Sequence, residues 1–304
     1  MDSTVSWPRR IGRMIRKVVL FAVVLCVVGY VVLSIVIAHI LTRPNNRPNG
    51  FDPKQISPAI TRWSTTTADG LTIRGWYAPT PASRRLIVLV HGLGGSLDEM
   101  SEIGRDLHAR GFGVLVFDLR GHGQSDPSRL YLGSRERGDV RAVLEWATKQ
   151  GFTPDRIGWL GHSMGGATLI MEGERNPQIQ ALVIDSAYGN LPKLLDRQLS
   201  DSSGLPRWFN PGILLAARLF FGVRTDNLMP VQSIRNWGDR PLFLIHGERD
   251  SIVPIGQAHE IIATAGPKCE TMILPDVEHV GAYHADPQRY IDAVGGFFDR
   301  NLAR

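Results

Sequence analysis

A long apolar run near the N-terminus is the feature that most limits how this chain can fold. Residues 18–41 are VVLFAVVLCVVGYVVLSIVIAHIL, of which 21 of 24 are hydrophobic and none is charged. A helix of about 20 such residues is long enough to cross the hydrocarbon core of a bilayer. The run therefore predicts a transmembrane helix, and a long helix in the core of a soluble domain is the alternative.

The charges around this run predict its orientation. A basic cluster lies directly before it, and only scattered charges follow, beginning at Arg43. The cluster consists of Arg9, Arg10, Arg13, Arg16 and Lys17. The positive-inside rule then predicts a cytoplasmic N-terminus and a C-terminal domain on the outer (periplasmic, extracellular or lumenal) side of a cell membrane. A cleaved signal peptide is the alternative, but its apolar region would be only about 7–15 residues long. We therefore expect an uncleaved single-pass signal-anchor.

The overall charge has a local origin. The chain carries a net charge of +5, and its pI near 9.5 is typical of many nucleic-acid-binding proteins. Residues 1–17 carry a net charge of +4, from five basic residues and Asp2. The rest of the chain carries a net charge of only +1. No nucleic-acid partner is therefore expected, whereas the basic cluster can contact anionic lipid. Cys26 lies inside the apolar run and Cys269 far along the chain, so no disulfide is predicted.

The remaining sequence predicts one linker and one large domain. Residues 42–61 are rich in Pro and Asn and predict a linker. In residues 62–304, two β-prone runs flank Asp69-Gly70 and predict a hairpin. Short apolar runs then alternate with helical patterns, which predicts an α/β fold whose mostly parallel sheet is covered on both faces by helices. The predicted strands are 86–90, 114–117, 157–160, 181–184, 242–245 and 271–274, and the predicted helices include 97–110, 134–150 and 256–265.

One connection is too long for a simple crossover. About fifty residues, 187–239, separate two predicted strands, and they include four prolines and an apolar stretch at 213–221. We expect this segment to be a short, mostly helical lid insertion.

A candidate nucleophile lies between a strand and a helix. Gly161-His162-Ser163-Met164-Gly165 has the pattern Gly-x-Ser-x-Gly directly after the strand 157–160. This arrangement predicts a nucleophile elbow, a sharp turn that exposes the serine hydroxyl at a helix N-terminus. An ordinary helix N-cap at Ser163 is the alternative.

A serine nucleophile needs a base and an acid, and this architecture predicts the order Ser, Asp or Glu, then His. Asp250 follows the strand 242–245 and His279 follows the strand 271–274, so we expect them to complete the triad. Asp185, at the end of the strand 181–184, is the alternative acid, and His284 is the alternative base.

These motifs together resemble the α/β-hydrolase superfamily over residues 62–304. The matching segments are His91-Gly92-Leu93-Gly94-Gly95, residues 118–125 (DLRGHGQS), the elbow, residues 246–250 (HGERD) and Glu278-His279. The single N-terminal span and short insertion are similar to the membrane-anchored group related to the yeast Bem46 protein. The resemblance implies an oxyanion hole formed by the backbone N–H groups of Leu93 and Met164. It also implies that glycine-flanked histidines in the strand-end loops, such as His91, His122 and His246, hold loops together.

The predicted activity is that of a serine hydrolase of the carboxylesterase or lipase type. It would cleave an acyl ester, from a small-molecule or lipid-like substrate, through an acyl-enzyme. The first alternative is a peptidase, aminopeptidase or amidase with the same triad. The second alternative is a non-catalytic binding domain. His162, Trp208 and Phe209 are candidate pocket residues, although the two aromatic residues could instead pack the lid. The sequence has no metal-ligand or dinucleotide motif, so no cofactor and no metal are expected.

Overall fold

The computed structural model describes residues 7–81 and 83–303, with side chains from residue 11 onward. The predicted basic segment 1–17 is therefore described only in part, and Asp2 lies outside the described residues. The chain divides into two compact units. The first joins the N-terminal helix to residues 199–223, and the second comprises residues 43–198 and 224–304. The predicted insertion 187–239 is thus shared between the two units.

The first unit is built on the long helix α1 (Trp7–Thr42). Within the described residues, its segment Ile11–Thr42 is the one helix long and apolar enough to cross a membrane. The mean hydropathy of its most apolar window is 3.0, and 6% of that window is buried.

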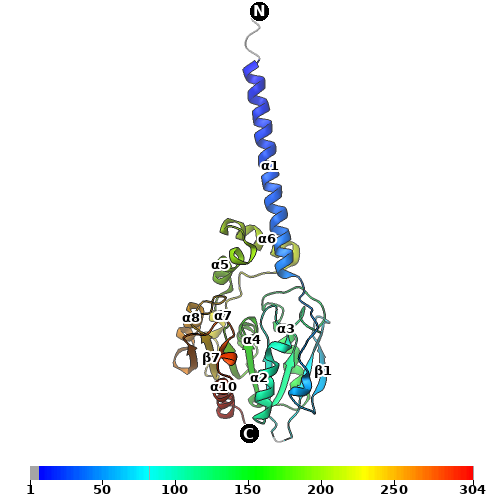
Figure 1. Ribbon diagram of the computed structural model, residues 1–304, viewed down its shortest axis with the longest axis vertical. Helices are drawn as coiled ribbons and strands as arrows, with labels where there is room; N and C mark the ends of the chain where they lie inside the picture. Colours follow the sequence, from blue (N-terminus) through cyan, green and yellow to red (C-terminus); the bar gives the residue numbers. More distant parts are fainter. Residues whose placement is uncertain (1–6, 82, 304) are drawn as a thin grey trace, which may run out of the picture. The chain divides into compact units, whose positions relative to one another are not determined.

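A second apolar helix, α6 (Asn210–Phe221), packs on the C-terminal half of α1 (Figure 1). The Tyr30 ring stacks on Trp208 and Phe209, with centroids 5.7 and 4.9 Å away. Gly212 lies against Tyr30 and Ser34 so closely that a Cβ atom would overlap both side chains. A small residue at this crossing therefore allows the two helices to approach closely.

The second unit contains an eight-stranded sheet. Its strands are β1 (Thr61–Thr66), β2 (Thr72–Ala78), β3 (Leu86–Val90), β4 (Gly113–Phe117), β5 (Ile157–His162), β6 (Ala181–Asp185), β7 (Leu242–Gly247) and β8 (Cys269–Leu274). Their order in the sheet is β1-β2-β4-β3-β5-β6-β7-β8. The hairpin β1–β2 pairs antiparallel with β4, and every later neighbour is parallel. The predicted fold class is confirmed.

Helices cover both faces of this sheet, because its central strands carry apolar side chains on both sides. Leu86, Val88 and Val90 of β3 face one core cluster, and Ile87 and Leu89 face the other. The first cluster lies under α3 (Arg137–Lys149), α4 (Met164–Arg175), α7 (Pro230–Ile234) and α8 (Gly256–Ala265). The second lies under α2 (Leu97–Ala109) and α10 (Pro287–Asn301). The remaining helices are α5 (Leu191–Ser203), α9 (Ala282–Ala285), η1 (Pro53–Gln55), η2 (Pro154–Arg156), η3 (Arg207–Phe209) and η4 (Gly266–Lys268).

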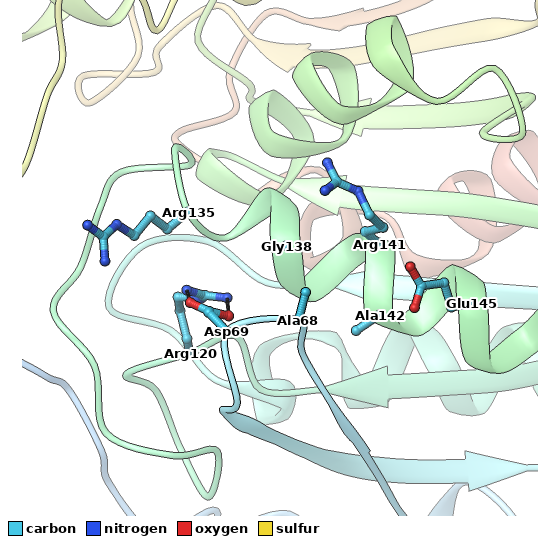
Figure 2. Close-up of a pocket in the computed structure, with 8 residues that line it drawn as sticks. All are labelled: Ala68, Asp69, Arg120, Arg135, Gly138, Arg141, Ala142 and Glu145. Carbon is cyan, nitrogen blue, oxygen red and sulfur yellow. Dashed lines mark hydrogen bonds and ion pairs between the residues drawn. The ribbon is translucent and has the colours of Figure 1, made fainter.

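A buried arginine ties the β1–β2 turn to α3. The side chain of Arg120 is 2% exposed and donates to the carboxylates of both Asp69 and Asp139. Figure 2 shows Arg120 and Asp69 facing each other beside the start of α3, at a shallow pocket. The hydrogen bonds from Arg120 hold the pKa of Asp69 at about 2. Asp69 is 51% exposed and Asp139 is fully buried, so the two ion pairs differ in their access to water.

This difference predicts unequal effects of two matched substitutions. Asp139→Asn leaves the buried Arg120 charge poorly compensated and should lower the free energy of unfolding by about 3 kcal/mol. Asp69→Asn removes a partner that water can replace and should cost less than about 1 kcal/mol. Urea unfolding of the full chain in detergent micelles measures both values. Equal losses in the two variants would contradict the proposed role of burial.

Candidate active site

The candidate nucleophile lies at a strained turn between β5 and α4. Ser163 has φ 47° and ψ −117°, a conformation that a non-glycine residue rarely adopts. The turn is possible because its neighbours are glycines. A Cβ at Gly165 would overlap the carbonyl oxygens of Val90 and His91, and one at Gly161 would lie 2.5 Å from the Gly166 nitrogen. The Ser163 side chain makes no N-cap hydrogen bond to α4, so the N-cap alternative is wrong.

Three side chains from three strand ends form one hydrogen-bonded chain. His279 Nε2 lies 3.0 Å from Ser163 Oγ, and His279 Nδ1 lies 2.7 Å from Asp250 Oδ2. Ser163 follows β5, Asp250 follows β7 and His279 follows β8. In this geometry the carboxylate accepts from Nδ1–H, which leaves Nε2 free to take the serine proton.

The carboxylate of the candidate acid is fully buried. The second oxygen of Asp250 accepts from the backbone N–H groups of Ile252 and Val253, at 3.0 and 2.7 Å. His246 contacts the carbonyl oxygen of Val253 through Nε2, which also lies 3.4 Å from Asp250 Oδ2. These contacts fix the orientation of the carboxylate, and therefore that of the His279 ring.

The glycine-rich loop after β3 lies against the nucleophile. A Cβ at Gly92 would stand 3.2 Å from Ser163 Cβ. The Gly92 N–H points to Glu99 at 3.4 Å, and the Gly94 N–H donates to His122 Nε2 at 3.2 Å. Leu93, the predicted oxyanion donor, lies between these two anchored glycines. Met164, the second predicted donor, is the first residue of α4, where the backbone N–H has no acceptor within its own helix.

His91 and His122 link this loop to the loop after β4. His91 Nε2 accepts from the Leu119 N–H at 3.0 Å, and His91 Nδ1 lies 2.7 Å from the Gly92 carbonyl oxygen. Burial lowers the pKa of His122 to about 3, so its Nε2 is available as an acceptor. These two histidines thus hold backbone in place next to Ser163.

The segment before the hairpin also reaches this loop. The Asn45 amide donates to the Gly94 carbonyl oxygen at 2.6 Å, and the Asn46 amide donates to three carbonyl oxygens of residues 122–125. Asn49 donates to Asp118 at 2.9 Å. The N-terminal part of the predicted linker is therefore bonded to the loops that border the candidate nucleophile.

A second polar network lies beneath the elbow. His162 Nδ1 lies 2.8 Å from Glu99 Oε1, and its Nε2 lies 3.7 Å from Asp185 Oδ2 and 3.5 Å from the Tyr290 hydroxyl. Burial alone would lower the pKa of His162, but the Glu99 hydrogen bond and the Asp185 charge raise it overall. Burial alone would raise the pKa of Glu99, but His162 lowers it overall. Both directions favour an ion pair between His162 and Glu99.

Ser186 connects this network to the candidate base. Its hydroxyl lies 3.0 Å from Asp185 Oδ1 and accepts from the backbone N–H of Val280, the residue after His279. Val280 has φ 51°, which is rare for a β-branched residue, and Ser186 has φ 57°. The sequence reasoning missed Glu99, Ser186 and Val280. Only Ser186 carried a signal, since it lies two residues after the predicted strand 181–184.

The alternative residues lie elsewhere. Asp185 faces His162 rather than His279. His284 lies on α9, where its ring contacts Tyr283. Of the predicted pocket residues, His162 is 2% exposed, and Trp208 and Phe209 stack on Tyr30 in the first unit. Within residues 7–81 and 83–303, no group of three or more His, Cys, Asp or Glu side chains is arranged to hold a metal ion.

The Glu99–His162 pair predicts a stability difference that depends on pH. The Glu99 contribution is complete above its ordinary pKa of 4.5, because its folded pKa is lower. The His162 contribution is complete below its ordinary pKa of 6.5 and is lost as the pH rises through its raised folded pKa. Glu99→Gln should therefore cost most between pH 4.5 and 6.5, by about 2 kcal/mol, and less at higher pH.

Urea unfolding across this pH range measures the effect. The matched control is Glu102→Gln on the exposed face of the same helix, which should change stability by less than about 0.5 kcal/mol at every pH. A Glu99→Gln penalty that stays constant from pH 5 to pH 9 would refute the ion pair.

Comparisons with known proteins agree with the fold and the elbow. A family model described as alpha/beta hydrolase fold matches residues 85–229. The chain is 26% identical to the uncharacterized protein YfhR of Escherichia coli K12, over 74% of this chain and 76% of YfhR. It is 30% identical to lysophosphatidylserine lipase ABHD12 of Macaca fascicularis, over 63% of this chain and 48% of that protein.

A solved structure resembles this chain over most of the length of both proteins. The Pyrococcus furiosus esterase Pf2001 superposes with a TM-score of 0.71 and 25% sequence identity, and the match covers 86% of this chain and 100% of that chain. The strand order, the turn at Ser163 and these similarities together show that this chain has the α/β-hydrolase fold.

Proposed function

We propose that this chain is a membrane-anchored serine hydrolase that cleaves carboxylic esters through an acyl-enzyme. The observation that carries the proposal is the hydrogen-bonded chain from Ser163 through His279 to Asp250, with distances of 3.0 and 2.7 Å. A serine hydroxyl is a weak nucleophile unless an adjacent base accepts its proton and a third group orients that base. Each of these roles has one well-placed side chain here.

The reaction follows from this geometry. His279 Nε2 takes the proton of Ser163 Oγ as that oxygen forms a bond to the ester carbonyl carbon. The resulting oxyanion accepts hydrogen bonds from the Leu93 and Met164 N–H groups, and each such donor contributes about 3 kcal/mol of transition-state stabilisation. The C–O bond to the alcohol then breaks, and His279 protonates the leaving oxygen. Water, activated by His279, hydrolyses the acyl-enzyme and restores the serine.

The negative charge of Asp250 supports both steps. It accepts from His279 Nδ1 and stabilises the imidazolium that forms when the serine proton is transferred. Because the carboxylate is fully buried and held by two backbone N–H groups, little reorganisation is needed during the reaction.

The similarity to a lysophosphatidylserine lipase favours an ester over an amide substrate. The anchor is α1, with the N-terminus in the cytoplasm and the second unit, which carries the sheet, on the opposite side of the membrane. The length of α1, its composition and the basic residues before Val18 support this orientation. The same layout supports membership in the Bem46-like group.

We expect removal of the Ser163 hydroxyl group to abolish most of the esterase activity. Ser163→Ala should lower kcat/KM on nitrophenyl esters by a factor on the order of 10⁴ or more, because no other group can form the acyl-enzyme. Ser64→Ala, an exposed serine on β1, should retain wild-type activity. Steady-state hydrolysis in detergent micelles measures both variants.

A substrate panel separates esters from amides. Nitrophenyl esters of increasing acyl length are compared with aminoacyl anilides on the wild-type chain. We expect faster turnover of the esters. Faster turnover of the anilides would identify an amidase or aminopeptidase instead, and undiminished ester turnover by Ser163→Ala would exclude the proposed nucleophile.

A further inference from the structure

The helix α6 exposes several apolar side chains although it packs on α1. Ile213, Ala216 and Ala217 are buried, at the spacing of one helix face. Leu215, Leu219 and Phe220 are nevertheless 56%, 67% and 60% exposed. Trp208, just before α6, is 64% exposed. A surface helix of a water-soluble unit normally turns polar residues outward, so α6 departs from that pattern.

The contacts between the two helices fix the direction of α6 along α1. At its start, Trp208 and Phe209 stack on Tyr30, and the Tyr30 hydroxyl lies 3.3 Å from the Trp208 carbonyl oxygen. At its end, Phe221 contacts the His39 ring at 5.6 Å. The helix α6 therefore runs parallel to α1, beside residues 30–39.

These residues of α1 belong to the apolar run. At 1.5 Å per residue, about 20 residues span the hydrocarbon core, so a membrane that begins at Val18 extends to about Ile37. Tyr30 and Ser34, which contact the start of α6, lie within that interval. If lipid surrounds residues 30–39 of α1, it therefore also surrounds α6, which packs on them.

We propose that α6 is a second membrane contact, inserted beside α1 into the leaflet at the C-terminal end of the span. Trp208, Leu215, Leu219 and Phe220 contact lipid there. The composition of the site fits a bilayer interface, where tryptophan and tyrosine rings are enriched and arginines extend to the headgroups. Arg218, which is exposed, lies in the last turn of α6, close to the end that contacts His39.

The inference concerns the lid insertion rather than the chemistry of the active site. It adds a membrane contact that the N-terminal anchor does not supply, and it would place part of the connection between β6 and β7 in lipid. It depends on α1 as the membrane span and is independent of the proposed catalytic residues.

Site-specific fluorescence tests this proposal on the full chain in phosphatidylcholine vesicles. The two native cysteines are replaced by Cys26→Ser and Cys269→Ser, and an NBD label is attached after Leu219→Cys or, separately, after Leu215→Cys. A label on Gln178→Cys, exposed in the second unit, is the aqueous control. A label on native Cys26, in a chain with only Cys269→Ser, is the membrane control.

Two quenchers give opposite expectations. A nitroxide-labelled phosphatidylcholine should reduce the emission of labels at positions 215 and 219, as it does at Cys26, whereas aqueous iodide should leave them unchanged. The label at position 178 should respond only to iodide. Quenching of the labels at 215 and 219 by iodide would overturn the proposal, because it would place them in water. Labels that neither quencher reaches would also overturn it, because they would be buried against protein instead of lipid. If the nitroxide-labelled lipid did not quench the label at Cys26, α1 would not span the membrane and the proposal would fail.

Discussion

The backbone turn at Ser163 is the constraint on which the rest of the active site depends. A serine with φ 47° costs on the order of 1–3 kcal/mol, and the surroundings must offset that cost. The sheet supplies the compensation, because β5 is buried along its whole length and pairs with β3 and β6. The Ser163 N–H donates to the Asp185 carbonyl oxygen at 2.8 Å, which anchors the turn to the neighbouring strand.

Two polar networks meet at this turn. In the first, hydrogen bonds join Ser163 to His279 and His279 to Asp250. In the second, Glu99 is hydrogen-bonded to His162, whose Nε2 lies 3.7 Å from Asp185 Oδ2. Ser186 joins them, since it contacts Asp185 and also holds the Val280 backbone beside His279. The second network therefore holds in place the backbone beside His279 and the glycine-rich loop. Asn45 extends this support to the segment that follows α1.

The sequence predicted the parts of this arrangement that are governed by local pattern. Fully apolar five-residue runs bounded by turn residues, such as 86–90, are typical of strands buried on both faces. Ser163 lies between such a strand and a glycine-rich helix start. The strand-end rule for parallel sheets indicated where candidate site residues should lie, and the elbow architecture predicted the order Ser163, Asp250 and His279.

Other features depend on long-range packing that no local pattern encodes. Glu99 is one acidic residue among several on α2, and only the fold shows that it faces His162. The left-handed conformation of Val280 has no sequence signal, because a β-branched residue disfavours it. The packing of α6 on α1 joins segments that lie about 170 residues apart, so the two apolar stretches could be recognised separately but not paired.

The proposed mechanism requires Ser163 to form a covalent bond with its substrate, and active-site labelling measures the formation of such a bond. The full chain in detergent micelles is treated with a fluorophosphonate, digested, and analysed by mass spectrometry. We expect a single modified peptide that contains Ser163, and no modification of the Ser163→Ala variant. An unmodified wild-type chain would instead indicate a non-catalytic binding domain, and equal labelling of the variant would indicate another nucleophile.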